Sequence, residues 1–360
     1  MKPWSRTGAA LALGAAALSP GCSSSSHSSG PAALEYTAIK APECIADTAD
    51  AFVTQNTPPV VPHFPSMPNT GYYLVVRYLG EDSIAGSPGY DWSSVTGLAV
   101  PEPRPRWQRS RTDDAVPGTS SAFQLHCTDA GSFLDTATFP WRDIVGGGPH
   151  TVYGFAFNTP APQPLFDASP GTQFVIQANA EIPWLRTTVP AATLSTPGPV
   201  GQVNLFAYFR DRRSARVFGL ILGLFDSRYG ASGLYDAHVA HDTYTPYVSQ
   251  PLGGPSPWVA RPAESQAFTG VPWTGLRLFR GLVTQERFAR AIADVNAWCR
   301  AHRDQRFCDA AGADANAFSA DPLDYEATDF GVLHEVVRGN PGGDIAMGLH
   351  VSDVGLWNAR

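Results

Sequence analysis

The densest group of residues that could do chemistry is a short segment with two Asp and two His: Asp236, His238, His241 and Asp242. Imidazole and carboxylate groups bind Zn²⁺ and related metals, so this segment is a possible metal site. The His-x-x-His spacing argues against that use, because positions 238 and 241 of an extended segment point to opposite faces. We therefore predict a hydrogen-bonded or sugar-contacting loop and no bound metal, with Zn²⁺ as the alternative.

Aromatic residues crowd the Pro-, Gly- and Ser-containing segment around this cluster. A flat ring can stack on a sugar while neighbouring polar groups bind its hydroxyls, although any one of these rings could equally belong to the core. We predict carbohydrate binding by loops within 229–273. The candidate ligand-binding residues are Tyr229, Tyr235, Asp236, His238, His241, Asp242, Tyr244, Trp258 and Trp273.

An enzyme on the same scaffold is the alternative to a binding protein. A glycoside hydrolase needs two facing carboxylates. The candidates are Glu181, Asp226, Asp236 and Glu335, which the sequence alone does not pair. A polysaccharide lyase would instead use His238 or His241 with Tyr244 as base and acid. The sequence therefore does not identify catalytic residues.

Three further motifs are weaker candidates for a functional site. His334-Glu335 begins a near match to the zinc-protease motif His-Glu-x-x-His, but the fifth position is Arg338 and the context is that of a strand. The acidic run 309–329 lacks the spacing of a Ca²⁺-binding EF-hand, so we predict a solvated loop. The Arg- and Pro-rich stretch 101–111 predicts an exposed loop or extended segment. No cofactor is predicted, with Ca²⁺ or Zn²⁺ as the alternatives.

Short strands must position these residues. Runs of β-branched and aromatic residues, several with a period of two, predict strands at 72–78, 122–127, 151–158, 173–182, 202–210, 217–225, 330–337 and 345–356. Val217–Phe225 is apolar on both faces, which predicts a central strand, and the polar turn before it predicts a hairpin with 202–210. The expected fold is mainly β, a two-sheet jelly-roll-like β-sandwich with one C-terminal helix and long irregular loops.

The predicted helix covers residues 284–303. Thr284 can cap it, and Phe288, Ile292, Val295 and Trp298/Cys299 recur at spacings of three and four residues. This apolar stripe is the face that should pack on a sheet.

Composition limits the classes of function. The chain has 34 Gly and 32 Pro in 360 residues, which argues against helical bundles and coiled coils. Two of the 25 basic residues are Lys and the other 23 are Arg, so lysine chemistry is nearly absent from the sequence. Loss of residues 1–21 would remove two bases and no acid, lowering the net charge from −7 to −9. Such an acidic domain is a poor candidate for binding nucleic acid.

The N-terminus is typical of an exported protein. Lys2 and Arg6 precede an apolar stretch at 8–18, and the small residues of Ser19-Pro20-Gly21 are typical of a signal-peptide cleavage site. The segment ending at Cys22 resembles the lipid-attachment site of bacterial lipoproteins, and that resemblance implies lipidation of Cys22 and a location on the outer membrane or cell surface. Ordinary cleavage at the same bond would give a freely secreted protein. The predicted regions are a signal peptide (1–21), a Ser-rich tether (22–30), a Pro-rich irregular and β region (31–150) and the sandwich domain (151–360).

Four cysteines remain after Cys22, an even number that predicts two disulfides in an exported chain. We favour Cys299–Cys308, which closes a short loop, and Cys44–Cys127. Four cysteines allow three pairings, so the sequence does not decide between them.

The sequence supports three hypotheses of function. The first is an exported, lipid-anchored β-sandwich whose partner is a carbohydrate or another cell-surface polymer, which meets the membrane through its lipid alone. The second is a glycoside hydrolase or polysaccharide lyase on the same scaffold. The third is a structural cell-envelope protein without a small ligand.

Overall fold

A computed structural model gives the fold, and before residue 164 it describes the backbone alone. The described residues are 36–40, 49–55, 72–78, 107–112, 119–125, 129–135, 150–167, 171–187, 199–241, 245–310, 312, 315–337 and 345–359. The signal and tether, Cys22, Cys44, Cys127, Asp242 and Tyr244 lie outside this set, so the predictions made for them stay predictions.

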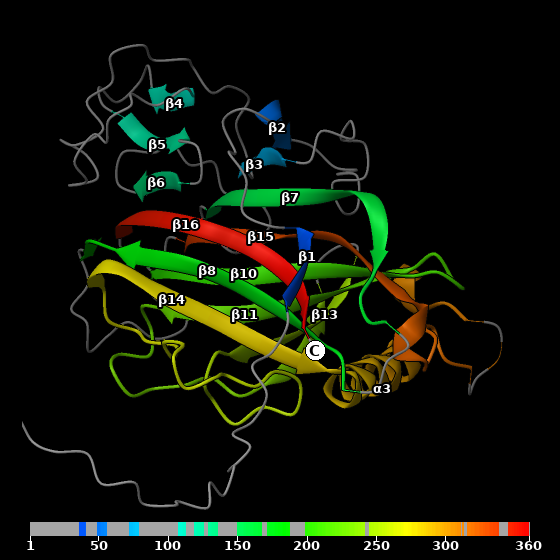
Figure 1. The fold of residues 1–360 in the computed structure, drawn as a ribbon. Helices are drawn as coiled ribbons and strands as arrows, with labels where there is room; N and C mark the ends of the chain where they lie inside the picture. Colours follow the sequence, from blue (N-terminus) through cyan, green and yellow to red (C-terminus); the bar gives the residue numbers. More distant parts are fainter. Residues whose placement is uncertain are drawn as a thin grey trace, which may run out of the picture. The chain divides into compact units, whose positions relative to one another are not determined.

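The strands among the described residues form two eight-stranded sheets. Sheet A has the order β14-β8-β16-β6-β5-β4, and β1 and β9 also pair with β16. Its strands are β1 (Tyr36–Lys40), β4 (Trp107–Thr112), β5 (Thr119–Leu125), β6 (Asp129–Asp135), β8 (Gln173–Ile182), β9 (Leu185–Thr187), β14 (Trp273–Thr284) and β16 (Ile345–Ala359). In Figure 1, β14, β8 and β16 lie in front of β11 and β10, which belong to the other sheet.

Sheet B has the order β12-β13-β11-β10-β15-β7-β3-β2. Its strands are β2 (Ala49–Gln55), β3 (Tyr72–Tyr78), β7 (His150–Pro164), β10 (Val200–Asp211), β11 (Val217–Asp226), β12 (His238–His241), β13 (Pro246–Pro251) and β15 (Tyr325–Val337). Most neighbouring strands are antiparallel, while β11 with β13 and β2 with β3 are parallel. Strands from the predicted 31–150 region thus pair with strands of the sandwich domain in both sheets.

The predicted two-sheet sandwich of jelly-roll type is confirmed in its two sheets and its C-terminal helix. The hairpin of β10 and β11 is also confirmed, and β11 lies between β10 and β13 as a central strand. The strands predicted at 330–337 and 345–356 exist, but they belong to different sheets, so the chain crosses the sandwich between them.

One end of the space between the sheets is filled by α3 (Gln285–Ala301), which follows β14 directly (Figure 1). The Thr284 hydroxyl accepts a hydrogen bond from the Arg287 N–H at 3.2 Å, which confirms the predicted N-cap. Phe288 is 1% exposed. Its ring contacts Phe174 of sheet A and Phe209 and Phe218 of sheet B, with centroids 5.0–5.9 Å apart. The apolar stripe of the helix is therefore core, as predicted.

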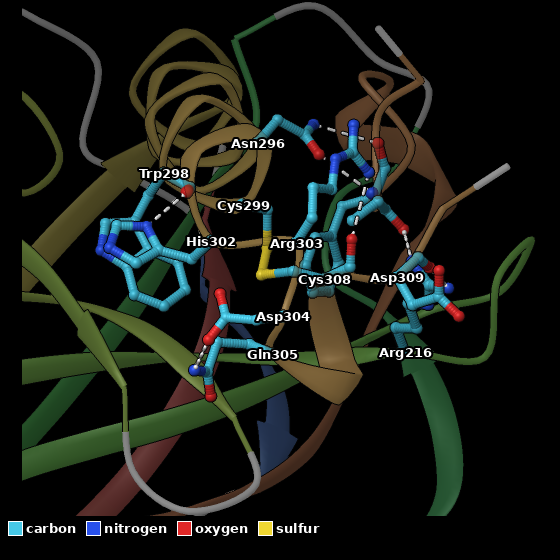
Figure 2. The surroundings of a disulfide bond; sticks show 12 residues. Arg216, Asn296, Trp298, Cys299, His302, Arg303, Asp304, Gln305, Cys308 and Asp309 are labelled. Carbon is cyan, nitrogen blue, oxygen red and sulfur yellow. Dashed lines mark hydrogen bonds between the residues drawn. A yellow bond between two sulfur atoms is a disulfide. The ribbon is translucent and has the colours of Figure 1, made fainter. Parts of the chain in front are cut away.

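A disulfide fixes the chain after α3. Cys299 and Cys308 are bonded with their Cα atoms 4.9 Å apart, which confirms this predicted pair. The loop between them ends in the short 3-10 helix η2 (Arg306–Cys308). Figure 2 shows Trp298 and His302 stacked on one side of the disulfide, with ring centroids 4.0 Å apart, and Arg303 on the other side.

One sequence interpretation needs correction. The acidic run 309–329 is not all loop, since it contains the 3-10 helix η3 (Pro322–Asp324) and the start of β15. Its acids pair with arginines of the β10–β11 hairpin: Arg213 Nε lies 2.6 Å from the Asp324 carboxylate, and Arg210 forms an ion pair with Glu326. In the stretch 101–111, predicted to be a loop or an extended segment, residues 107–111 belong to the extended strand β4.

Candidate functional site

The predicted His and Asp segment does not form one cluster. His238 and Asp236 are exposed, and the His238 Nδ1 atom lies 2.8 Å from the Asp236 carbonyl oxygen. The His238 ring contacts Tyr235, whereas the His241 ring contacts Trp298 of α3 with centroids 5.2 Å apart. The two histidines therefore serve different surroundings, as the spacing predicts. Among the residues described, no group of three or more His, Cys, Asp or Glu side chains could hold a metal ion.

The predicted tyrosines form a small aromatic cluster over sheet B. The rings of Tyr229, Tyr235 and Phe268 contact one another with centroids 5.6–5.9 Å apart. The Tyr235 hydroxyl accepts hydrogen bonds from the Gly223 N–H and the Ser249 hydroxyl. Burial raises the pKa of this hydroxyl above its ordinary value. The group is neutral and its hydrogen bonds are internal, so this cluster functions chiefly as packing.

Trp258 and Trp273 lie in the core, 4% and 5% exposed. The Trp258 indole N–H donates to the Asp294 carboxylate of α3, and the Trp273 indole N–H donates to the Ala180 carbonyl, each at 2.9 Å. A buried ring with a satisfied N–H has no face for a sugar to stack on. We therefore leave both residues out of the candidate site.

Two of the predicted carboxylates lie on sheet B with partners of their own. The Asp226 carboxylate accepts from the Arg228 Nε at 2.9 Å and also binds its terminal nitrogen. The pKa of Arg228 is raised, and the hydrogen bond to Asp226 is the largest cause of this shift. Glu335 accepts a hydrogen bond from the Gln202 amide, and Gln202 pairs with Asp226 across the next strand. The two carboxylates share one row of the sheet and are each tied to a side chain.

A stronger constellation lies on the outer face of sheet A. Residues 345, 347, 349 and 351 of β16 belong to the buried core, so the alternate residues face outward. Glu181 pairs with His350 and Asn179 with Ser352, which places these four side chains on the outer face. At Asp353, which has φ of +52°, a bulge shifts the alternation, so that Gly355 and Trp357 also face outward.

Two partly exposed tryptophans lie over glycines of this face. A Cβ atom added to Gly348 would come within 2.8 Å of the Trp184 indole nitrogen. A Cβ atom on Gly355 would come within 2.2 Å of the Trp357 ring. Trp184 reaches this position because Pro183 interrupts the ladder between β8 and β9, while the Trp184 carbonyl still accepts from the Gly348 N–H at 3.2 Å. Glycine thus makes room for each ring to lie against the sheet.

Polar side chains line the strand between the two rings. Asn179 Nδ2 donates to the Asp353 carboxylate at 2.6 Å, and the Ser352 hydroxyl donates to the same oxygen at 3.1 Å. The Glu181 carboxylate accepts from the Gly275 N–H at 2.7 Å, and its other oxygen lies 3.7 Å from His350 Nδ1. We call this set the tryptophan face; it consists of Trp184, Trp357, Gly348, Gly355, Asn179, Glu181, His350, Ser352 and Asp353.

An arginine borders the tryptophan face next to Gly355. Gln177 pairs with Gly355 and accepts a hydrogen bond from Arg280 Nε at 2.9 Å. The Arg280 guanidinium also forms an ion pair with Glu264 at 2.9 Å. This basic group is therefore matched by an acid, and among the side chains that the structure describes the face also carries the carboxylates of Glu181 and Asp353.

Sequence reasoning included Glu181 but missed the rest of the tryptophan face. The alternation in 345–352, with Gly348, His350 and Ser352 between apolar residues, was the available signal. The bulge at Asp353 reverses the pattern, so the sequence alone does not show that Trp357 shares the face of His350. The pairing of β16 with β8 supplies the remaining side chains.

Comparison with known proteins adds little. No protein-family model matches the chain, and no curated protein matches it either. Among solved structures, it is similar to a loop-swap mutant of Necallimastix patriciarum Xyn11A, with 9% sequence identity, covering 72% of this chain and 97% of that chain. The TM-score is 0.19, so we draw no conclusion about function from this likeness.

Proposed function

We propose that the protein is an exported, lipid-anchored β-sandwich that binds a carbohydrate or related cell-surface polymer on its tryptophan face. The observation that carries this proposal is the pair of indole rings lying over Gly348 and Gly355, with hydrogen-bonding side chains between them. An indole presents a flat apolar surface to the C–H side of a sugar ring. The polar side chains beside it bind hydroxyl groups and fix the orientation of the ligand.

The length of the face favours an oligosaccharide over a single sugar. Gly348 and Gly355 are roughly 20 Å apart along β16 at the usual rise per residue. A ligand that contacts both indole rings must therefore span several sugar units. The side chains come from paired strands, which hold them in fixed positions before a ligand arrives. A preformed site loses little conformational entropy on binding.

Export and anchoring are the second part of the proposal. The Cys299–Cys308 disulfide supports an oxidising compartment outside the cytosol. The signal-like segment, Cys22 and the Ser-rich tether support attachment to a membrane through a lipid alone. In the part of the chain that the structure describes, no helix is long and apolar enough to cross a membrane. Labelling cells with a fatty acid tests the anchor: we expect label on the wild type and none on Cys22→Ala. Label retained by the variant would refute lipidation at Cys22.

The binding test uses calorimetry or affinity electrophoresis with a panel of purified polysaccharides and their oligomers. We expect Trp184→Ala and Trp357→Ala each to weaken binding by about tenfold, because each removes the flat apolar surface on which a sugar ring stacks. Trp298→Ala is the matched control, because Trp298 is partly buried on α3 and contacts His302 instead of the tryptophan face. It should leave affinity unchanged.

A comparison with Tyr229→Ala distinguishes the two surfaces. Tyr229 belongs to the aromatic cluster over sheet B, from which the sequence predicted binding. If affinity falls for Tyr229→Ala and stays unchanged for Trp184→Ala and Trp357→Ala, the tryptophan face is not the site. If no polymer binds the wild type, the proposed function is wrong and a structural envelope role is favoured.

Hydrolysis is the second candidate, because Glu181 and Asp353 place two carboxylates on one face. In such a reaction one acid protonates the glycosidic oxygen, the other removes a proton from water, and the hydroxyl joins the anomeric carbon. Release of reducing ends from a bound oligosaccharide, lost in both Glu181→Gln and Asp353→Asn, would establish it. Binding without release of reducing ends, and without an unsaturated lyase product, supports a binding protein.

A further inference from the structure

We propose that the tryptophan face selects amino sugars, that is, glycans carrying a free ammonium group, over neutral and anionic glycans. This inference rests on the proposed carbohydrate binding and goes further by naming the charge of the ligand. Two carboxylates lie between the indole rings of the face, and both support this preference.

The carboxylates of the face are held as acceptors. The Asp353 carboxylate is fixed through one oxygen, which accepts from Asn179 and Ser352. Among the described residues no hydrogen bond reaches its second oxygen. The Glu181 carboxylate is fixed by the Gly275 N–H, and its side chain is 15% exposed. Both groups therefore present negative charge and acceptor oxygens to a ligand.

Two basic side chains that the structure describes adjoin the two carboxylates. Arg280 lies at its border and is already paired with Glu264. His350, 23% exposed, is the basic group next to Glu181. Among the described residues of the tryptophan face itself there is no Arg or Lys. Uronate, sulfate or phosphate groups would meet the two carboxylates, whereas the Arg280 guanidinium is already paired with Glu264, and like charges repel at this range.

An ammonium group fits the same place well. It donates hydrogen bonds to carboxylate oxygens, and such charge-assisted bonds are roughly twice as strong as neutral ones. Asn179 and Glu181 are two residues apart on β8, about 7 Å along the strand, so the two carboxylates lie near the same stretch of a bound chain. The indole rings would hold the sugar rings while the carboxylates bind the amino groups.

The test compares oligomers that differ only in this charge. The probes are glucosamine oligomers, the same oligomers fully N-acetylated, and galacturonate oligomers of equal length. Calorimetry measures their affinities at an ionic strength of about 150 mM. We expect the free-amine oligomer to bind about tenfold more tightly than the acetylated one, the difference that one charge-assisted bond provides. The galacturonate oligomer should bind most weakly.

Isosteric variants locate the selectivity. Glu181→Gln and Asp353→Asn each remove one charge and should reduce the preference for the amine about tenfold, with smaller effects on the acetylated oligomer. Asparagine tolerates the positive φ of residue 353, so the bulge should persist. The matched control is Asp304→Asn, which removes an exposed charge from the disulfide loop. It should leave the preference unchanged.

The outcomes separate the two proposals. Equal affinities for the amine and acetylated oligomers, both lost in Trp184→Ala, would overturn the selectivity and leave carbohydrate binding intact. A preference reduced equally by Asp304→Asn and Glu181→Gln would show a general charge effect and would also overturn it. If none of these three oligomers binds at millimolar concentration, the selectivity is overturned. The proposed function fails with it only when no polymer of the wider panel binds either.

Discussion

Trp357 lies across Gly355, two residues earlier on the same strand, so closely that a Cβ atom at Gly355 would lie 2.2 Å from its indole ring. The ring can adopt this position only because the residue beneath it has no side chain. The orientation of the ring, and with it the shape of the tryptophan face, therefore depends on a glycine that would not itself touch a ligand.

The first prediction follows from this contact. Gly355→Ala should push the Trp357 ring away from the sheet and weaken oligosaccharide binding about tenfold, close to the effect of Trp357→Ala, while changing the free energy of unfolding by less than about 1 kcal/mol. Calorimetry measures the loss of affinity, and near-ultraviolet circular dichroism reports the movement of the Trp357 ring. If Gly355→Ala acts through the ring alone, the double variant should bind no worse than Trp357→Ala. Additive losses would contradict this explanation.

His334 predicts a pH dependence of stability. It points into the core from β15, is fully buried, and has its pKa lowered to about 3 by burial, with Glu335 opposing the shift. An unfolded His has a pKa near 6.5, so between these values the unfolded chain binds the proton and the folded chain does not. Stability from this group is complete above about pH 6.5 and falls as the pH decreases toward 3.

The expected loss between pH 7 and pH 5 is about 2 kcal/mol. Urea unfolding at both values measures it, and His334→Leu should reduce the difference by that amount because the leucine does not titrate. An unchanged pH dependence in the variant would mean that His334 is not the responsible group.

Removing the disulfide should lower stability without abolishing binding. The double variant Cys299→Ala/Cys308→Ala opens a short loop at the end of α3, for which loop-closure entropy predicts a loss of about 2–3 kcal/mol. Urea denaturation followed by tryptophan fluorescence tests this, and reduced wild-type protein should match the variant. The tryptophan face belongs to sheet A, so its affinity should stay the same. A loss of affinity would show coupling that the structure does not explain.

Phe288 should contribute more to stability than any partly exposed ring near it. It contacts phenylalanines of both sheets, so Phe288→Ala creates a cavity where the helix joins the sandwich. Such truncations cost about 3–5 kcal/mol. Phe307→Ala provides the control, since Phe307 is partly exposed on the disulfide loop, and it should cost about 1 kcal/mol or less. Comparable losses in both variants would contradict the role of Phe288.

Local patterns were sufficient where the chain interacts with its own neighbours. The Thr284 cap and the 3–4 spacing of Phe288, Ile292 and Val295 predicted α3, because both signals act within a few residues. The apolar run at 217–225 predicted a strand buried on both sides. The short spacing of Cys299 and Cys308 predicted their disulfide.

Local patterns failed where position depends on a distant partner. Trp258 and Trp273 read as loop aromatics from their Pro and Gly neighbours, but contacts with α3 and β8 bury them. The acidic run at 309–329 read as solvated loop because its partners, the arginines at 210–216, are about a hundred residues away in the sequence.

The sequence by itself determined the β-rich class and the helix with its cap. Tertiary structure decided which side chains meet. Glu181 and His350 become neighbours only through the pairing of β8 with β16, and Trp357 joins them only because the bulge at Asp353 shifts the alternation by one residue. A strand's period of two says which residues share a face, but a bulge and a distant partner strand decide which face that is.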